Sequence, residues 1–79
     1  MTPSTSLQIR QSITESLPGA EVVVTAGSPG HVSISVSAEE FRDKTKLACQ
    51  RLVYKAIAPL LSGERPLVHA VDRLETRAP

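Results

Sequence analysis

Cysteine and aromatic residues are scarce in this chain of 79 residues. A single cysteine, Cys49, excludes a disulfide within the chain and a cysteine-rich metal site, and it fits a reducing compartment. One tyrosine, one phenylalanine and no tryptophan leave the core to aliphatic side chains. Because 41% of the residues are hydrophobic, such a core is possible, and the length suits one small domain.

Long apolar runs and an excess of one charge are also missing. No run approaches the roughly 20 apolar residues of a membrane-spanning helix, and residues 1–6 lack the regions of a signal peptide. We therefore expect a soluble cytoplasmic protein, or an organellar one that has lost its transit peptide. Nine basic and eight acidic residues give a net charge of +1, which is not the strong basic excess of a dedicated nucleic-acid binder. A local basic patch remains compatible with this balance.

Hydrophobic periodicity and turn residues predict six elements along the chain. They are a helix over 6–17, strands over 21–26 and 31–37, a short helical turn from Ala38, a long helix from about Thr45 and a strand over 66–74. Ser37 and Glu40 have capping-box spacing at the start of the short turn. Pro59 predicts a kink or an early end of the long helix, because proline lacks the N–H of a helical bond. Residues 1–5 and 75–79 are expected to fray.

The order αββααβ predicts a single α+β domain over residues 1–79. The expected architecture is a three-stranded mixed sheet with helices on one face. Its clearest strand is 31–37, in which Val32, Ile34 and Val36 alternate with polar residues, as in a strand with one buried face. The loop over 27–30 joins this strand to the preceding one as a hairpin.

Four segments resemble sequence patterns of the BolA-like family, and the resemblance runs from about residue 9 to residue 76. They are 30–34 (GHVSI, beside the family's S-H-F-x-V), 41–45 (FRDKT, beside F-x-G-K-S), 51–54 (RLVY, beside R-x-V-Y) and 68–71 (VHAV, beside V/I-H-A-L/V). Each pattern alone is weak, whereas four in order at the right spacing are fairly specific. Asp43 stands where the family pattern has glycine.

The resemblance implies a class II KH-like fold and two activities. Members of the family pair with monothiol glutaredoxins and share a bridging [2Fe–2S] cluster in iron–sulfur trafficking or iron regulation, and some members are DNA-binding transcription regulators. By resemblance we expect an adaptor that shares such a cluster with a glutaredoxin and glutathione. The alternative is a KH-like nucleic-acid-binding regulator. The isolated chain is expected to hold no stable cluster and to be a monomer or a weak homodimer.

His69 is the first candidate for a metal ligand. Its apolar neighbours alone favour a half-buried histidine that is hydrogen-bonded within the fold. The resemblance favours a ligand instead, because the histidine of this motif is the family's cluster ligand. Imidazole suits an iron–sulfur centre, and histidine in place of cysteine raises the reduction potential. The neutral ring is the form that binds metal, so we expect cluster binding to weaken in acid.

His31 is the second candidate, at the start of a strand and on its polar face. A solvated residue at a strand start and a metal ligand are equally open readings from the residues. By resemblance, many members have a histidine or cysteine ligand in the preceding loop, where residues 26–30 of this chain offer none. His31 could take that place, another molecule could supply the ligand, or the adaptor could carry no cluster.

Two further features favour structural roles. Cys49 lies in the apolar stripe of the long helix, where a free cysteine behaves as a small hydrophobe. Residues 27–30 spell G-x-x-G, the loop with which KH domains clamp a nucleic-acid backbone. In those domains the loop joins two helices, whereas here it is predicted to join two strands.

Basic residues gather at the joint between the helices and on the long helix. Arg42, Lys44, Lys46 and Arg51 are the candidates for nucleic-acid binding under the alternative function. Such a charge run is most often a solvated face, and it could also steer a partner. No nucleophile motif, paired carboxylates or complete zinc ligand set stands out, so no enzymatic activity is expected.

Overall fold

The computed structural model describes residues 5–62 and 68–79. The elements of this part of the chain are α1 (Thr5–Ser16), β1 (Glu21–Ala26), β2 (His31–Ser37), the 3-10 helix η1 (Glu39–Phe41), α2 (Lys46–Leu61) and β3 (Ala70–Arg77). The predicted order αββααβ is confirmed, with a single 3-10 turn as the short helix.

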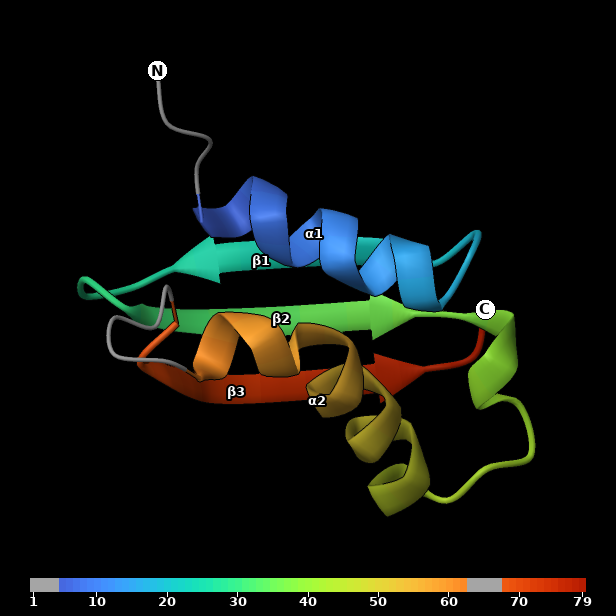
Figure 1. The fold of residues 1–79 in the computed structure, drawn as a ribbon. Coiled ribbons are helices and arrows are strands. Elements are labelled where there is room, and N and C mark those ends of the chain that lie inside the picture. The colour runs from blue at the N-terminus through green and yellow to red at the C-terminus, as the bar shows by residue number, and fades with distance from the viewer. Residues whose placement is uncertain (1–4, 63–67) are drawn as a thin grey trace.

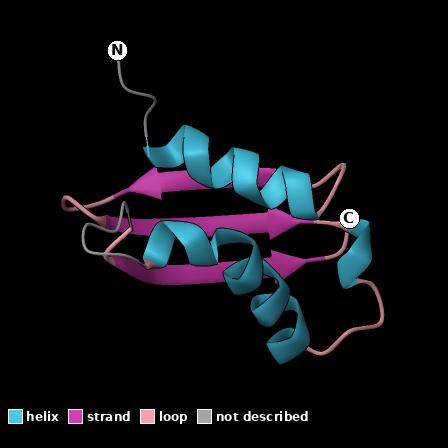
Figure 2. Cartoon of the chain, in the orientation of Figure 1, coloured by secondary structure: helices cyan, strands magenta, loops and turns pink. Residues whose placement is uncertain are grey.

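The three strands form one mixed sheet in the order β1-β2-β3. β1 pairs antiparallel with β2 through a short hairpin, and β3 pairs parallel with β2. A parallel pair needs a crossover connection, which α2 supplies. Both α-helices cover the same face of the sheet (Figure 1), and Figure 2 shows the resulting layer of helices on a layer of strands. The predicted fold class is therefore confirmed.

The core lies between the sheet and the two helices. Its buried residues are Ile9, Ile13, Leu17, Val32, Ile34, Val36, Ala38, Phe41, Cys49, Val53, Ile57 and Val68. Phe41 is the single aromatic residue among them, while Tyr54 is exposed. The predicted alternation of β2 is confirmed, since Val32, Ile34 and Val36 point into this core and the residues between them do not.

Both ends of α2 follow from local chemistry. Thr45 is the N-cap, and its side-chain oxygen accepts a hydrogen bond from the backbone N–H of Ala48 at 3.1 Å. Of the kink or early end predicted at Pro59, the early end is not found, because the helix runs on to Leu61 and Ser62 is its C-cap. Pro59 lies in the exposed last turn, where the hydrogen bond lost to the carbonyl of Lys55 leaves a group that water can reach.

The predicted capping box at Ser37 and Glu40 does not form. Ser37 is the last residue of β2, where it pairs with Glu21 on one side and Arg77 on the other. Its backbone is thus committed to the sheet. Ala38 is the N-cap of η1, with no hydrogen bond from a capping side chain.

The prediction for β3 is wrong at both ends. Pairing begins at Ala70, because its partner His31 is the first residue of β2, and residues 66 and 67 lie outside the described residues. The strand also continues to Arg77, which pairs with Ser37. One extra residue, Asp72, interrupts the register between the pairs Val32–Val71 and Ser33–Arg73. Because of this bulge, Leu74 pairs with Ile34 and its side chain lies on the core side of the sheet, whereas Asp72 and Arg73 are exposed.

The expectation of frayed ends is wrong for residues 75–77, which pair with residues 35–37 of β2. The backbone N–H of Ala38 also donates to the carbonyl of Arg77 at 3.0 Å. At the other end, Thr5 is already helical, and residues 1–4 lie outside the described residues.

Candidate functional site

The two histidines meet at one end of the sheet. His31 is the first residue of β2, and His69 directly precedes β3. Because these two strands run parallel, their starting points lie side by side, next to the turn that joins β1 to β2 (Figure 1). Residues far apart in the sequence are thereby brought into one site.

A tight turn over residues 27–30 sets the position of His31. The backbone N–H of His31 donates to the carbonyl of Ser28 at 2.8 Å, and the N–H of Gly27 donates to the carbonyl of His31 at 2.9 Å. Gly30 has a φ of 80°, the left-handed conformation that glycine adopts at low cost. The G-x-x-G segment is thus a hairpin loop between two strands, as predicted.

The carbonyl of Gly30 fixes the backbone of His69. It accepts hydrogen bonds from the N–H of His69 at 2.7 Å and from the N–H of Ala70 at 3.0 Å. On the other side of His69, Val68 is buried and its N–H donates to the carbonyl of Leu60 at 3.0 Å. The histidine is therefore held between α2 and the hairpin.

The imidazole rings of His31 and His69 are neighbours. Their centroids lie 5.8 Å apart and their planes are inclined by 55°. The His31 side chain is 35% exposed, and His69 is exposed rather than buried in the core. Both predicted ligand residues thus lie in one accessible patch, and the half-buried position that the apolar neighbours favour for His69 is not found.

A third side chain, Asp72, joins this patch and was not predicted. Its Oδ1 lies 3.0 Å from Nδ1 of His31. The signal in the sequence is slight: Asp72 and Arg73 are two consecutive polar residues that interrupt the alternation of a strand. That break marks the bulge, but it does not reveal which residue of β2 the carboxylate contacts.

Cys49 is buried in the core, unlike the two histidines. Its side chain is 4% exposed, and its Sγ donates a long hydrogen bond of 3.7 Å to the carbonyl of Phe41. The prediction of a structural role is confirmed by this burial in the core. A thiol in this position is not presented to a metal at the surface.

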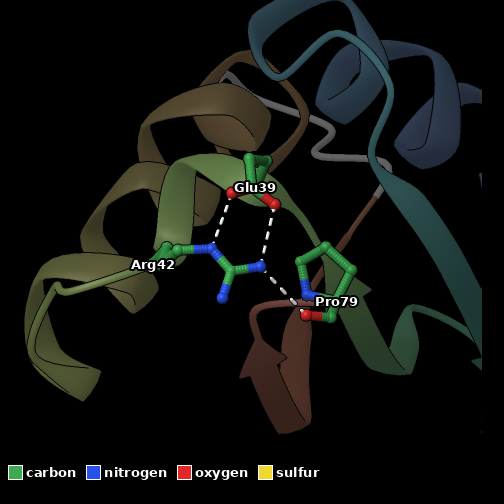
Figure 3. A network of polar contacts seen from close by, with 3 residues as sticks. All are labelled: Glu39, Arg42 and Pro79. Carbon is green, nitrogen blue, oxygen red and sulfur yellow. Dashed lines mark hydrogen bonds and ion pairs between the residues drawn. The ribbon is translucent and has the colours of Figure 1, made fainter.

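The four basic candidates are exposed, but one of them is already engaged. Nε of Arg42 donates to Glu39 at 2.6 Å and its Nη2 at 3.0 Å, and Nη2 also donates to the carbonyl of Pro79 at 3.1 Å (Figure 3). These hydrogen bonds lower the pKa of Glu39 and raise the pKa of Arg42. Nε and Nη2 of Arg42 are therefore engaged within the chain, so Lys44, Lys46 and Arg51 are the candidates more available to an outside partner.

Residues 5–62 and 68–79 hold neither a larger metal-binding cluster nor a membrane-spanning helix. In this part of the chain no group of three or more histidine, cysteine, aspartate or glutamate side chains is arranged to hold a metal ion. None of the described helices has both the length and the apolar character that crossing a bilayer requires.

Known proteins resemble this chain in sequence and in fold. A family model described as BolA-like protein matches residues 4–79. The solved structure of a BolA homologue from Coxiella burnetii is 29% identical, with a TM-score of 0.76 over 100% of this chain and 94% of that one. BolA1 from Arabidopsis thaliana is 18% identical, with a TM-score of 0.78 over 99% of this chain and 95% of that one. Yeast Fra2 is 26% identical, with a TM-score of 0.67 over 95% and 80% respectively. No curated protein sequence matches significantly.

Proposed function

The chain belongs to the BolA-like family, and from that membership we propose that it is an adaptor that binds a monothiol glutaredoxin and shares a bridging [2Fe–2S] cluster with it. The observation that carries the proposal is the pair of neighbouring imidazoles of His31 and His69, 5.8 Å apart. One of them occupies the motif whose histidine is, by resemblance, the family's cluster ligand.

The donor set suits half of such a cluster. In Rieske centres two histidines replace two cysteines on one of the two irons, and this ligation raises the reduction potential of the cluster. His69 and His31 would supply two nitrogen ligands from one patch. The cysteine of the glutaredoxin and the thiol of glutathione would ligate the other iron. Because four ligands are needed and the chain offers two imidazoles, a partner is required for stable binding.

The residues of the chain have a binding role in this proposal and no catalytic one. His69 is exposed on a backbone that hydrogen bonds fix on both sides, so its ring can meet a partner without a rearrangement of the strand. A shallow depression beside His31, between Thr5 and Ser6 of α1 and the 27–30 loop, gives that partner further surface. We propose an adaptor and not an enzyme.

Visible absorption of the mixed complex tests the proposal. The chain is combined with a monothiol glutaredoxin and glutathione under reducing, anaerobic conditions, and the spectrum is compared for His69→Ala and His31→Ala. We expect His69→Ala to lower the cluster content at least about ten-fold, a loss that even outer-shell partners of a metal can cause. An unchanged spectrum in His69→Ala would contradict its role as a ligand.

Cys49→Ala is the matched control, because it removes the single thiol of the chain from a buried position. Its complex should keep the spectrum of the wild-type complex. Binding of the glutaredoxin without a visible chromophore would instead support an adaptor that carries no cluster. Absence of any complex, together with salt-dependent binding in a DNA shift assay, would support the nucleic-acid-binding alternative.

A further inference from the structure

We propose that Asp72 is a positioning residue of this site, which selects the ring nitrogen that His31 presents to a metal. Its carboxylate holds the proton of His31 on Nδ1, so that Nε2 is left with a free lone pair. The contact between Asp72 and His31 is given by the geometry. Its role in binding an iron of the cluster rests on the proposed function.

The distance and the chemistry of the two groups support this assignment. Oδ1 of Asp72 lies 3.0 Å from Nδ1 of His31, within hydrogen-bond range. An ionised carboxylate can only accept, so Nδ1 must be the donor and must carry the proton. In a neutral imidazole the other nitrogen, Nε2, is then the acceptor and the potential ligand. Metal-binding histidines commonly have this arrangement, in which a carboxylate orients the ring through its second nitrogen.

The β-bulge explains how Asp72 reaches the ring. Asp72 is the extra residue between the pairs Val32–Val71 and Ser33–Arg73, and it has no direct partner on β2. Bulges change the direction of a side chain and are frequent beside functional sites. As a result, Asp72 and Arg73 are both exposed, and Asp72 lies next to the start of β2.

The hairpin loop lies near the same carboxylate. A Cβ built on Gly27 would lie 3.8 Å from Oδ2 of Asp72 and 3.8 Å from Cβ of His31. The carboxylate thus faces the Gly27 side of the loop, with room left for a side-chain carbon between them, while its other oxygen contacts the imidazole. Because the hydrogen bonds of the turn hold His31 without Asp72, the carboxylate can be removed without removal of the turn.

Nitrogen NMR of the isolated chain tests the contact without any cluster. Long-range ¹H–¹⁵N correlation of labelled histidines, at a pH where imidazole is neutral, reports which ring nitrogen carries the proton. We expect His31 to be protonated mainly on Nδ1 in the wild type. Asp72→Ala should shift His31 toward the Nε2-protonated form that an unconstrained histidine prefers, while His69 in the same spectrum stays unchanged.

Two variants separate positioning from general effects. Asp72→Asn keeps the size of the side chain, but its amide can donate as well as accept, so the preference for Nδ1–H should weaken. Glu75→Ala removes another exposed carboxylate of β3, which pairs with Arg73 at 2.6 Å rather than with a histidine. This control should leave the His31 tautomer as it is in the wild type.

The complex with glutaredoxin and glutathione gives the second readout. We expect Asp72→Ala to weaken cluster retention roughly ten-fold relative to the wild type and to Glu75→Ala, the usual scale for loss of an outer-shell partner. A wild-type His31 protonated on Nε2, or a tautomer that Asp72→Ala does not alter, overturns the inference. A cluster that forms and is equally stable in Asp72→Ala overturns it for iron while the proposed function stands. A shifted tautomer without any cluster in the wild type supports the contact and overturns the proposed function.

Discussion

At the residue scale, Gly30 meets two demands at once. Its φ of 80° lies in the left-handed region, and a Cβ added to it would lie 2.8 Å from Cβ of His69. Cβ of His69 is not the movable end of a flexible side chain, so one of the two backbones would have to shift. Glycine at this position therefore allows the hairpin to approach the residue that precedes β3.

Gly30→Ala should destabilise the fold and move His69. We expect a loss of about 2–3 kcal/mol in the free energy of unfolding, from an unfavourable left-handed residue of about 1–2 kcal/mol and the close contact besides. Denaturant unfolding measures the loss. The amide resonances of His69 and Ala70, which donate to the Gly30 carbonyl, should shift in the same variant.

Gly19→Ala separates these two contributions. Gly19 has a φ of 84°, but nothing lies within 4 Å of a Cβ added there. This variant should therefore show only the conformational cost, about 1–2 kcal/mol. Equal losses in the two variants would mean that the contact with His69 relaxes freely, which would contradict the tight packing inferred at Gly30.

Asp43 also adopts a left-handed backbone conformation, although it is not glycine. Its φ is 63°, and among the described residues no other non-glycine residue has a positive φ. The family pattern that the sequence resembles has glycine at this place. Aspartate tolerates the left-handed region better than most residues, so the turn between η1 and α2 is retained without glycine.

At the element scale, Arg42 links η1 to the end of the chain that follows β3. It bonds both oxygens of Glu39 and the carbonyl of Pro79 (Figure 3). These groups are exposed, and exposed ion pairs contribute little. The sign of their effect is nevertheless defined, because the hydrogen bond from Arg42 lowers the pKa of Glu39 in the folded chain.

The coupling between Glu39 and Arg42 should depend on pH. A carboxyl group whose pKa is lowered by folding stabilises the fold above its unfolded pKa, and this contribution is lost as pH falls toward the folded pKa. In a double-mutant cycle of Glu39→Gln and Arg42→Ala, we expect a small stabilising coupling at neutral pH that vanishes in acid. Thermal unfolding across that range measures it, and an equal coupling at both ends would contradict the ion pair.

At the scale of the whole molecule, stability depends on one small core. Domains of this length bury a smaller fraction of their surface than larger ones, and their total stability is roughly 4–12 kcal/mol. The contacts of α1 with the sheet, of α2 with the sheet and of α1 with α2 all involve the same cluster of buried residues. A cavity at one position in this core should therefore lower the free energy of unfolding of the whole domain.

Ile57→Ala should come close to unfolding the protein. Ile57 is fully buried on α2, and removal of such a side chain typically costs about 2–5 kcal/mol. Leu47→Ala on the same helix is the matched control, since Leu47 is 56% exposed and should cost less than about 1 kcal/mol. Denaturant midpoints of the two variants give the comparison, and equal losses would contradict the placement of the core.

The amino-acid sequence by itself determined the elements and their faces. The alternation in β2 and the apolar stripe of α2 are local patterns, and the structure has them where the periodicity predicts. The sequence likewise indicates His69 and His31, through the motifs that resemble the family's patterns. Local patterns suffice for these features because each depends on residues within a few positions of one another.

Only the tertiary structure decided what meets at the site. The limits of β3 follow from its parallel partner His31, and the bulge at Asp72 has meaning only once both strands are paired. The adjacency of the two imidazoles, the approach of Gly30 to His69 and the bond from His31 to Asp72 all join segments that are distant along the chain. The register that joins these segments is fixed when α2 carries the chain back across the sheet and buries its apolar stripe, and no local pattern encodes it.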